Sequence, residues 1–181
     1  TVNITINPVN DNDPVANNDA ITLNEGATAT LLDSTATSVI NNDTDVDLPN
    51  DTLTVTVCTG PSFASSFVLN ADGTFSYTHN GTENFTDSFT YVVSDADGGV
   101  TDTGTVNITI NPVNDNDPVA NNDAITLNEG TTATILDSTA TSVITNDTDV
   151  DLPNDTLTVT VGTGPSFASS FVLNADGTFS Y

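Results

Sequence analysis

The sequence predicts an all-β protein made of tandem seven-stranded antiparallel β-sandwich repeats. Three features predict this class: segments in which apolar and polar residues alternate, turn motifs that separate these segments, and a long internal repeat. Alternation matters because successive side chains of a strand point to opposite faces of the sheet. The 3.6-residue apolar period of a surface helix occurs nowhere in the chain.

Four expected strands lie in the first part of the repeat. Segments 20–23 and 28–32 begin it with Ile, Leu and Thr side chains, which suit a pleated, half-buried surface. Segment 52–57 reads Thr-Leu-Thr-Val-Thr-Val, so its three apolar side chains, the last of them Val57, should face the core together. Segment 66–69 should bury its Phe and its Leu in the same way.

Three further strands follow a tight turn. Segment 70–73 reads Asn-Ala-Asp-Gly, a hairpin signal because Asp-Gly tolerates positive φ. The next strand carries Phe75 and Tyr77 on one face, and 88–94 and 105–111 complete the unit with the same alternation. Seven strands in about 100 residues predict a two-sheet sandwich of immunoglobulin or cadherin type. An antibody-type domain with its Cys…Trp…Cys core is excluded, because the chain has no Trp and a single Cys.

The repeat sets the expected domain boundaries. Residues 1–77 recur at 105–181, a shift of 104, and the two copies differ at four positions. The segment at 10–14 reads Asn-Asp-Asn-Asp-Pro. This polar, turn-forming sequence, which ends in proline, is typical of a linker. Near-identical copies suit a spacer or a multivalent binder better than an enzyme, so no catalytic site is expected. We expect the last strand and linker of a preceding repeat at 1–13, a complete repeat with its linker at 14–117, and a partial following repeat that lacks its final strands at 118–181.

Composition excludes several functions. The 181 residues include 25 acidic residues and no Lys or Arg, which gives a formal net charge of −25. Nucleic acid is excluded as a partner, because phosphate binding depends on basic side chains. No apolar run approaches the roughly 20 residues of a membrane-spanning helix, so no membrane insertion is expected. Disorder is disfavoured, because 36% of the residues are hydrophobic. His79, the one side chain that could carry a positive charge, is expected in an exposed loop.

The acidic residues gather in the predicted loops. Loop 41–51 contains four Asp residues, a second loop contains Asp95 and Asp97, and a third group is the linker itself. Asp and Asn are also favoured in turns, so no single one of them indicates a ligand. Clustered carboxylates repel by about 1 kcal/mol per pair even in water, and the chain has no Lys or Arg to neutralise them. The pattern predicts Ca²⁺ as cofactor, because this ion takes six to eight oxygen ligands.

Four motifs occur in a specific order and spacing. They are Asp-Thr-Asp-Val-Asp at 43–47, Asn-Ala-Asp-Gly-Thr-Phe-Ser-Tyr-Thr at 70–78, Asp-Ser-Phe-Thr-Tyr-Val-Val-Ser-Asp-Ala-Asp-Gly-Gly at 87–99, and the strand and linker at 105–118. This order resembles the cadherin-like, VCBS-type tandem repeats of giant bacterial surface adhesins, such as the extender region of repeats-in-toxin adhesins. The resemblance covers the whole 104-residue unit.

The resemblance implies which residues bind calcium. In cadherins the base of one domain, the linker and the top of the next domain converge on the ions. Cadherins also carry an Asp-Arg-Glu motif, which is not present here, and either Glu83 or Asp87 would take its place. The expected ligands are Asn10, Asp11, Asn12, Asp13, Glu25, Asp45, Asp47, Asp87, Asp95, Asp97, Asn114, Asp115, Asn116, Asp117, Glu129, Asp149 and Asp151.

Three functions are open at this point. The leading one is a calcium-rigidified extracellular extender of a secreted or cell-surface protein, whose partners are the neighbouring repeats of the same chain. Such an extender projects a terminal binding domain or builds a matrix. The second is a cell- or carbohydrate-binding module, for which Phe63 and Phe167 are the candidate aromatic contacts. The third is a self-assembling extracellular filament, in which copies of the chain exchange strands.

Overall fold

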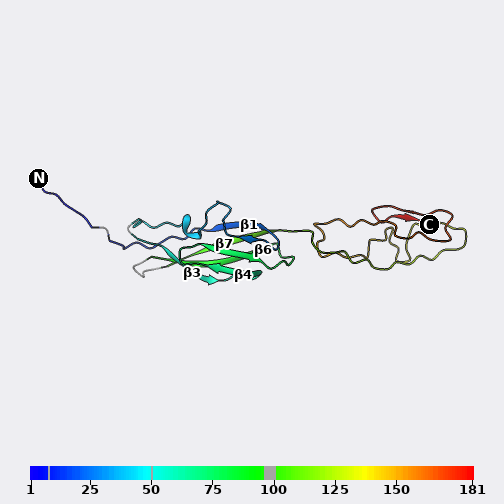
Figure 1. Ribbon diagram of the computed structural model, residues 1–181, viewed down its shortest axis with the longest axis horizontal. Helices are drawn as coiled ribbons and strands as arrows, with labels where there is room; N and C mark the ends of the chain where they lie inside the picture. Colours follow the sequence, from blue (N-terminus) through cyan, green and yellow to red (C-terminus); the bar gives the residue numbers. More distant parts are fainter. Residues whose placement is uncertain (8, 50, 96–100) are drawn as a thin grey trace. The chain divides into compact units, whose positions relative to one another are not determined.

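The chain folds into two compact units, which are described separately here. The computed structural model describes all residues except 8, 50 and 96–100. Unit 1 is Thr1–Val113 and unit 2 is Asn114–Tyr181 (Figure 1). Asp97, one of the expected ligands, lies outside the described residues.

Unit 1 is a two-sheet β-sandwich, as predicted. One sheet has the strand order β1-β7-β6-β3 and the other has the order β2-β5-β4. Among the described residues the one helical element is a 3-10 turn, η1 (Val39–Asn41). The seven strands are β1 (Asp19–Asn24), β2 (Thr28–Ala29), β3 (Thr54–Thr59), β4 (Ala64–Leu69), β5 (Phe75–His79), β6 (Thr86–Ser94) and β7 (Asp102–Asn111).

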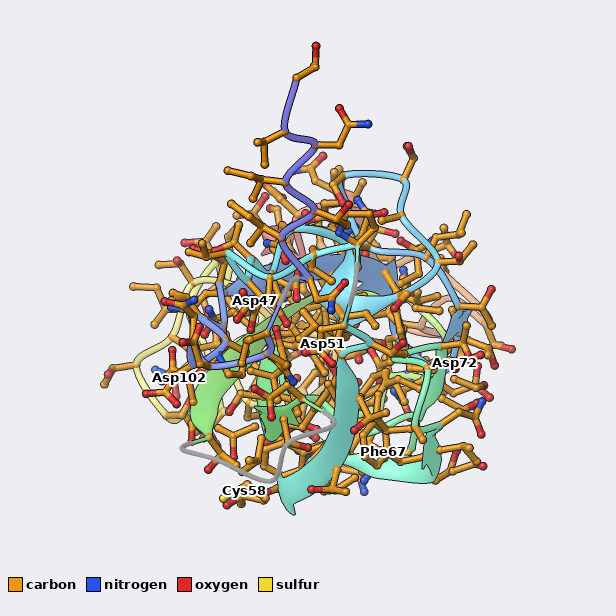
Figure 2. The ribbon with its side chains drawn as sticks, turned by 90° about the vertical axis from the view of Figure 1, so that its left-hand side faces the viewer. Asp47, Asp51, Cys58, Phe67, Asp72 and Asp102 are labelled. Atoms are coloured by element: carbon orange, nitrogen blue, oxygen red, sulfur yellow. The ribbon has the colours of Figure 1, made fainter. Side chains whose placement is uncertain are left out.

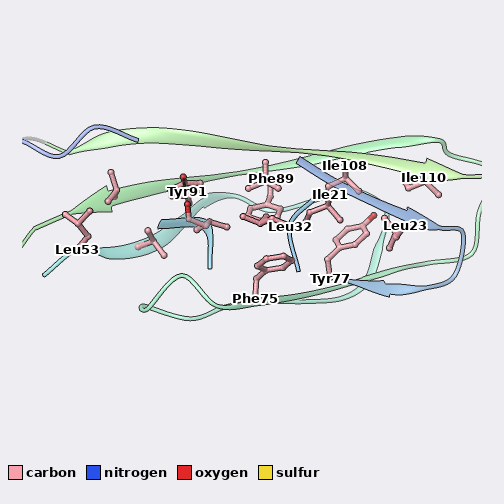
Figure 3. Close-up of a cluster of buried hydrophobic side chains, with 14 residues drawn as sticks. Ile21, Leu23, Leu32, Leu53, Phe75, Tyr77, Phe89, Tyr91, Ile108 and Ile110 are labelled. Carbon is pink, nitrogen blue, oxygen red and sulfur yellow. Dashed lines mark hydrogen bonds between the residues drawn. The ribbon is translucent and has the colours of Figure 1, made fainter. Parts of the chain in front are cut away.

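The core lies between the two sheets (Figure 3). Alternation decides which side chains enter it: Val106, Ile108 and Ile110 of β7 are buried, whereas the residues between them face outward. Phe89 of β6 connects the sheets, because its ring centroid lies 4.7 Å from that of Phe67 in β4. Burial of each such side chain stabilises the fold by roughly 1.5–3 kcal/mol.

The turn between β4 and β5 forms as its Asp-Gly sequence predicts. Asn70 N–H donates to Thr74 O at 2.8 Å, and Gly73 N–H donates to Asn70 O at 2.9 Å. Gly73 has φ +78°, and a Cβ at this position would collide with the Ser38 hydroxyl. Both constraints require glycine here.

The pairing of β1 with β7 is parallel, whereas an all-antiparallel sandwich was expected. Asp19 pairs with Val106 and Asn24 pairs with Asn111, and the other strand pairs of unit 1 are antiparallel. A hairpin forces its two strands to run antiparallel, but β1 and β7 are the first and last strands of the unit and are free of that constraint.

Two strand predictions were wrong in detail. Segment 28–32 forms a strand at Thr28–Ala29 only, because the chain turns into a loop in which Leu32 N–H donates to Ala36 O at 2.9 Å. Val57 is 44% exposed and not buried. The register of β3 against β6 shifts between Val57 and Thr59, and such a bulge interrupts the alternation of faces.

The expectation of an exposed His79 was also wrong, since this side chain is 1% exposed. His79 ends β5 and follows Phe75 and Tyr77 at intervals of two residues, so the strand turns it to the buried face. Its Nδ1 accepts backbone hydrogen bonds from Gly26 and Gly81, both at 3.3 Å.

Unit 2 contains little regular secondary structure. It contains one antiparallel pair, β8 (Val172–Leu173) and β9 (Phe179–Ser180). Segment 123–128 is identical in sequence to β1, yet it forms no strand and is exposed. In unit 1 this segment depends on β7 for its hydrogen bonds, so its strand conformation is decided by its partner.

Candidate metal centre

A backbone bridge sets up the candidate site in unit 1. Val15 N–H donates to Thr44 O at 2.8 Å, and Thr44 N–H donates to Val15 O at 3.0 Å. The bridge fixes the linker beside the acidic loop that follows η1. Figure 2 views this end of the unit and labels Asp47 and Asp51.

Asp47 holds the backbone of the linker. Its Oδ2 accepts the N–H groups of Asn12 at 2.8 Å and Asp11 at 3.0 Å. Asp47 N–H donates to Asp45 Oδ1 at 2.8 Å, an Asx turn that shapes the loop. The N–H groups of Asn12 and then Asp11 hold the pKa of Asp47 below its ordinary value, because they stabilise the ionised form.

Three carboxylates from separate parts of the chain meet in this region. Asp45 comes from the loop, Asp51 comes just before β3, and Asp95 follows the end of β6. One carboxylate oxygen from each of the three lies within 4.8 Å of the other two. Asp51 and Asp95 are each 8% exposed. At this separation two unit charges repel by about 0.9 kcal/mol in water, and by more where water is excluded.

The donor atoms of this cluster fit calcium. Asp45 Oδ2 and Asn10 Oδ1 are buried and have no hydrogen-bond partner among the described residues. The chain has no Lys or Arg to neutralise the three carboxylates. Carboxylate and amide oxygens are the ligands that Ca²⁺ prefers. A bound cation would therefore satisfy both the charge of the cluster and the unpaired oxygen of Asp45.

Unit 2 repeats the contacts between linker and loop. Asn116 N–H donates to Asp151 Oδ2 at 2.9 Å, and Asp151 N–H donates to Asp149 Oδ1 at 2.9 Å. Asp151 is 1% exposed, and Asp149 Oδ2 is a buried atom with no hydrogen-bond partner in the described part of the chain. The same local sequence thus produces the same half of a site in both units.

A second acidic group lies at the end of β1 in unit 1. Glu25 is 7% exposed, and its backbone N–H donates to Asn111 O at 2.9 Å. A carboxylate oxygen of Glu83 lies within 4.8 Å of one from Glu25. Of the two residues that could replace the missing cadherin motif, Glu83 is thus the one beside Glu25.

Asp87 has a different set of contacts. Its Oδ1 accepts the Ser62 N–H at 3.0 Å, and its Oδ2 accepts the Phe63 N–H at 2.9 Å and the Tyr77 hydroxyl at 3.0 Å. Both oxygens therefore hold the β3–β4 connection against the sandwich. Burial, followed by the hydrogen bond to Asp87, raises the pKa of Tyr77.

The structure adds Asp51, an acidic residue that the sequence-based ligand set omits, and it brings Glu83, named from the sequence only as the alternative to Asp87, next to Glu25. Asp51 is the last acidic residue of loop 41–51, and its place in that loop was the available signal. Glu83 lies between strands, where its distance to Glu25 depends on the fold. The remaining expected ligands are exposed side chains of the linkers and of unit 2: Asp11, Asn12, Asp13, Asn114, Asp115, Asn116, Asp117 and Glu129.

The family follows from residues 10–112, which match the bacterial cadherin-like domain. The chain belongs to this family. Residues 114–181 match the bacterial Ig domain. The cadherin-like β-sandwich predicted for the repeat is thereby confirmed. The family comprises structural and adhesion modules, and no enzyme family is indicated.

Solved cadherin structures share the fold of this cadherin-like chain. Human CDH23 EC21-23 is 21% identical with a TM-score of 0.57, and the alignment covers 94% of this chain and 55% of that one. Mouse Cadherin-23 EC22-24 is 17% identical with a TM-score of 0.58, with 95% and 54% covered. The chain therefore spans about half the length of these structures. No curated protein shows significant sequence similarity to it.

None of the helices in the described ranges has the length and apolar character needed to cross a membrane.

Proposed function

We propose that the chain is a calcium-rigidified extracellular extender, a structural segment of a larger adhesin or surface fibre. The observation that carries the proposal is the cluster of Asp45, Asp51 and Asp95, whose carboxylate oxygens lie within 4.8 Å of one another. Buried like charges at this distance destabilise the fold unless a cation is bound. Membership of the cadherin-like family supports calcium as that cation.

Asp45, Asp51 and Asp95 would hold the ion, with oxygens of the linker as further ligands. A bound Ca²⁺ supplies two positive charges and a preference for six to eight oxygens. Asp47 acts beside this site by fixing the linker through the N–H groups of Asp11 and Asn12. The linker would then be ordered together with the loop, which is how ion binding would stiffen the entry to the domain.

The repeat extends this proposal to successive domains. The linker at 114–117 has the same sequence as 10–13, and Asp149 and Asp151 repeat Asp45 and Asp47. Glu25 and Glu83 are the acidic residues at the other end of unit 1 that would contribute. Extracellular calcium modules bind with Kd of about 10⁻⁴–10⁻³ M, so such sites fill outside a cell and empty inside it.

A calcium titration of the full chain tests the proposal. Thermal melting in excess chelator is compared with melting in about 10 mM calcium, where a site of this affinity would add roughly 1.4–2.7 kcal/mol of stability. Small-angle scattering under the same two conditions should show a longer average end-to-end distance in calcium. Identical melting and scattering with and without calcium would refute the calcium role.

A filament built from several copies is the second candidate. Residues 1–7 have the same sequence as 105–111 of β7. Val2, Ile4 and Ile6 are 81–86% exposed, whereas Val106, Ile108 and Ile110 are at most 2% exposed. The exposed segment thus carries the side chains of a core strand, which favours strand exchange between copies. Sedimentation at rising concentration distinguishes the two candidates, because an extender stays monomeric.

A further inference from the structure

Two further carboxylates lie close together inside unit 1, apart from the proposed calcium cluster and from Glu25 and Glu83. Asp19 begins β1 and is 9% exposed, and Asp43, which follows η1, is 7% exposed. Between them stands the hydroxyl of Tyr91, a fully buried residue of β6. Tyr91 and its neighbours in the core are shown in Figure 3. The three residues come from three separate parts of the chain.

This centre contains more hydrogen-bond acceptors than hydrogens. The Tyr91 hydroxyl lies 3.1 Å from Asp43 Oδ1, 3.0 Å from Asn17 O and 3.2 Å from Val39 O, and it has one hydrogen to donate. Asp43 is already stabilised as an anion, because it also accepts the Asn17 N–H at 2.7 Å. Asp19 Oδ2 is buried and has no hydrogen-bond partner among the described residues. A further hydrogen on Asp19 would relieve this shortage.

The charged groups around Asp19 are all acidic. Asp43 faces it directly, Asp102 at the start of β7 acts on Asp43, and Asp33 lines the same hollow as Asp19. The neutral side chains of Tyr91 and Asn42 hydrogen-bond to Asp19 and favour its ionised form, but they are outweighed by burial and by the charge of Asp43. The Asp33 carboxylate accepts hydrogen bonds from the Thr22 N–H and hydroxyl, and Asp102 accepts the Ala16 N–H at 3.0 Å. Burial, and then the charge of Asp43, raises the pKa of Asp19 to about 7.

We propose that Asp19 is a neutral carboxylic acid in the folded domain and that its proton joins β1 to the centre formed by Asp43 and Tyr91. This proton stabilises the folded domain independently of the calcium sites. A proton suits this place better than a cation. Two carboxylates and one hydroxyl offer too few ligands for Ca²⁺, and Asp43 and Tyr91 are already engaged with each other.

The stabilisation that this proton provides depends on pH in a defined way. Asp19 would bind a proton on folding, because its pKa rises from the ordinary value of 3.8 to about 7. The stabilisation is fully present below about pH 4 and is lost as the pH rises through about 7. A difference of about three units corresponds to a change of up to about 10³-fold in the folding equilibrium constant. Calcium sites have the opposite sign, because their carboxylates must be ionised.

Carboxyl ¹³C NMR of the unaltered full chain tests the proposal directly. In excess chelator, the Asp19 carboxyl carbon should titrate at least about two units above the majority of the aspartates. Titration of Asp19 together with the other aspartates would overturn the proposal. So would a fall of its midpoint by more than about one unit on addition of calcium, because that result would identify a cation site.

The variant Asp19→Asn provides a second test. The amide retains a hydrogen donor and cannot ionise, so the folding equilibrium constant should change less between about pH 5 and pH 7.5 in chelator than it does in the parent chain. Asp123→Asn is the matched control, because Asp123 occupies the same place in an identical segment of unit 2 but is exposed. Burial and then the charge of Asp147 also raise the pKa of Asp123, but less than that of Asp19, so the control should lose less of the pH dependence. Equal pH dependence in Asp19→Asn and the parent chain would overturn the proposal. If the variant does not fold, the NMR titration decides alone.

Discussion

Replacement of Asp51 by Asn should stabilise the chain without calcium and remove most of the stabilisation that calcium provides. Asp51 is 8% exposed and lies within 4.8 Å of both Asp45 and Asp95, measured between carboxylate oxygens. In chelator the amide removes two like-charge repulsions of about 0.9 kcal/mol each, so the variant should be more stable than the parent by about 2 kcal/mol.

In calcium the advantage of the variant over the parent should shrink or disappear. The parent gains roughly 1.4–2.7 kcal/mol from one filled site at about 10 mM calcium, and the variant loses much of this gain with its charged ligand. For a domain of this size 1 kcal/mol moves the melting temperature by about 4–8 °C. Loss of this gain should therefore make the calcium-induced shift of the variant smaller than that of the parent by on the order of 10 °C.

Differential scanning calorimetry of the full chain measures both conditions. Asp87→Asn is the control, because Asp87 holds Ser62, Phe63 and Tyr77 and takes no part in the cluster. This variant should lose about 1–3 kcal/mol equally in calcium and in chelator, since it weakens a buried hydrogen-bond network. The reasoning fails if calcium raises the melting temperature of Asp51→Asn as much as it raises that of the parent.

Two further changes test the packing of unit 1. Gly104→Ala places a Cβ against the ring and hydroxyl of Tyr91, and overpacking of this kind should cost about 1–3 kcal/mol in urea unfolding. An unchanged urea midpoint would mean that the Tyr91 ring is free to move. His79→Ala removes a buried ring and the acceptor for the Gly26 and Gly81 N–H groups, so it should cost about 2–4 kcal/mol. Hydrogen exchange at these two amides should accelerate first, and equal acceleration throughout unit 1 would contradict this local role.

The strands could be predicted because their signal is local. In β7 each Val or Ile alternates with a polar residue, and this pattern alone determines which side chains face inward. His79 continues the alternation of Phe75 and Tyr77, so its burial could have been predicted from the same rule. The exposure of Val57 could not, because it depends on a bulge against β6 that has no signature in the segment itself.

The candidate site was only half predictable from the sequence. The sequence by itself determined that acidic residues gather in loop 41–51 and in the linker, and that no basic side chain can neutralise them. The tertiary structure alone decided that Asp51 and Asp95 join Asp45, because the ends of β3 and β6 meet only when the sheet forms. It likewise brought Asp19 and Asp43 to Tyr91, since burial and long-range contact depend on the packing of distant segments.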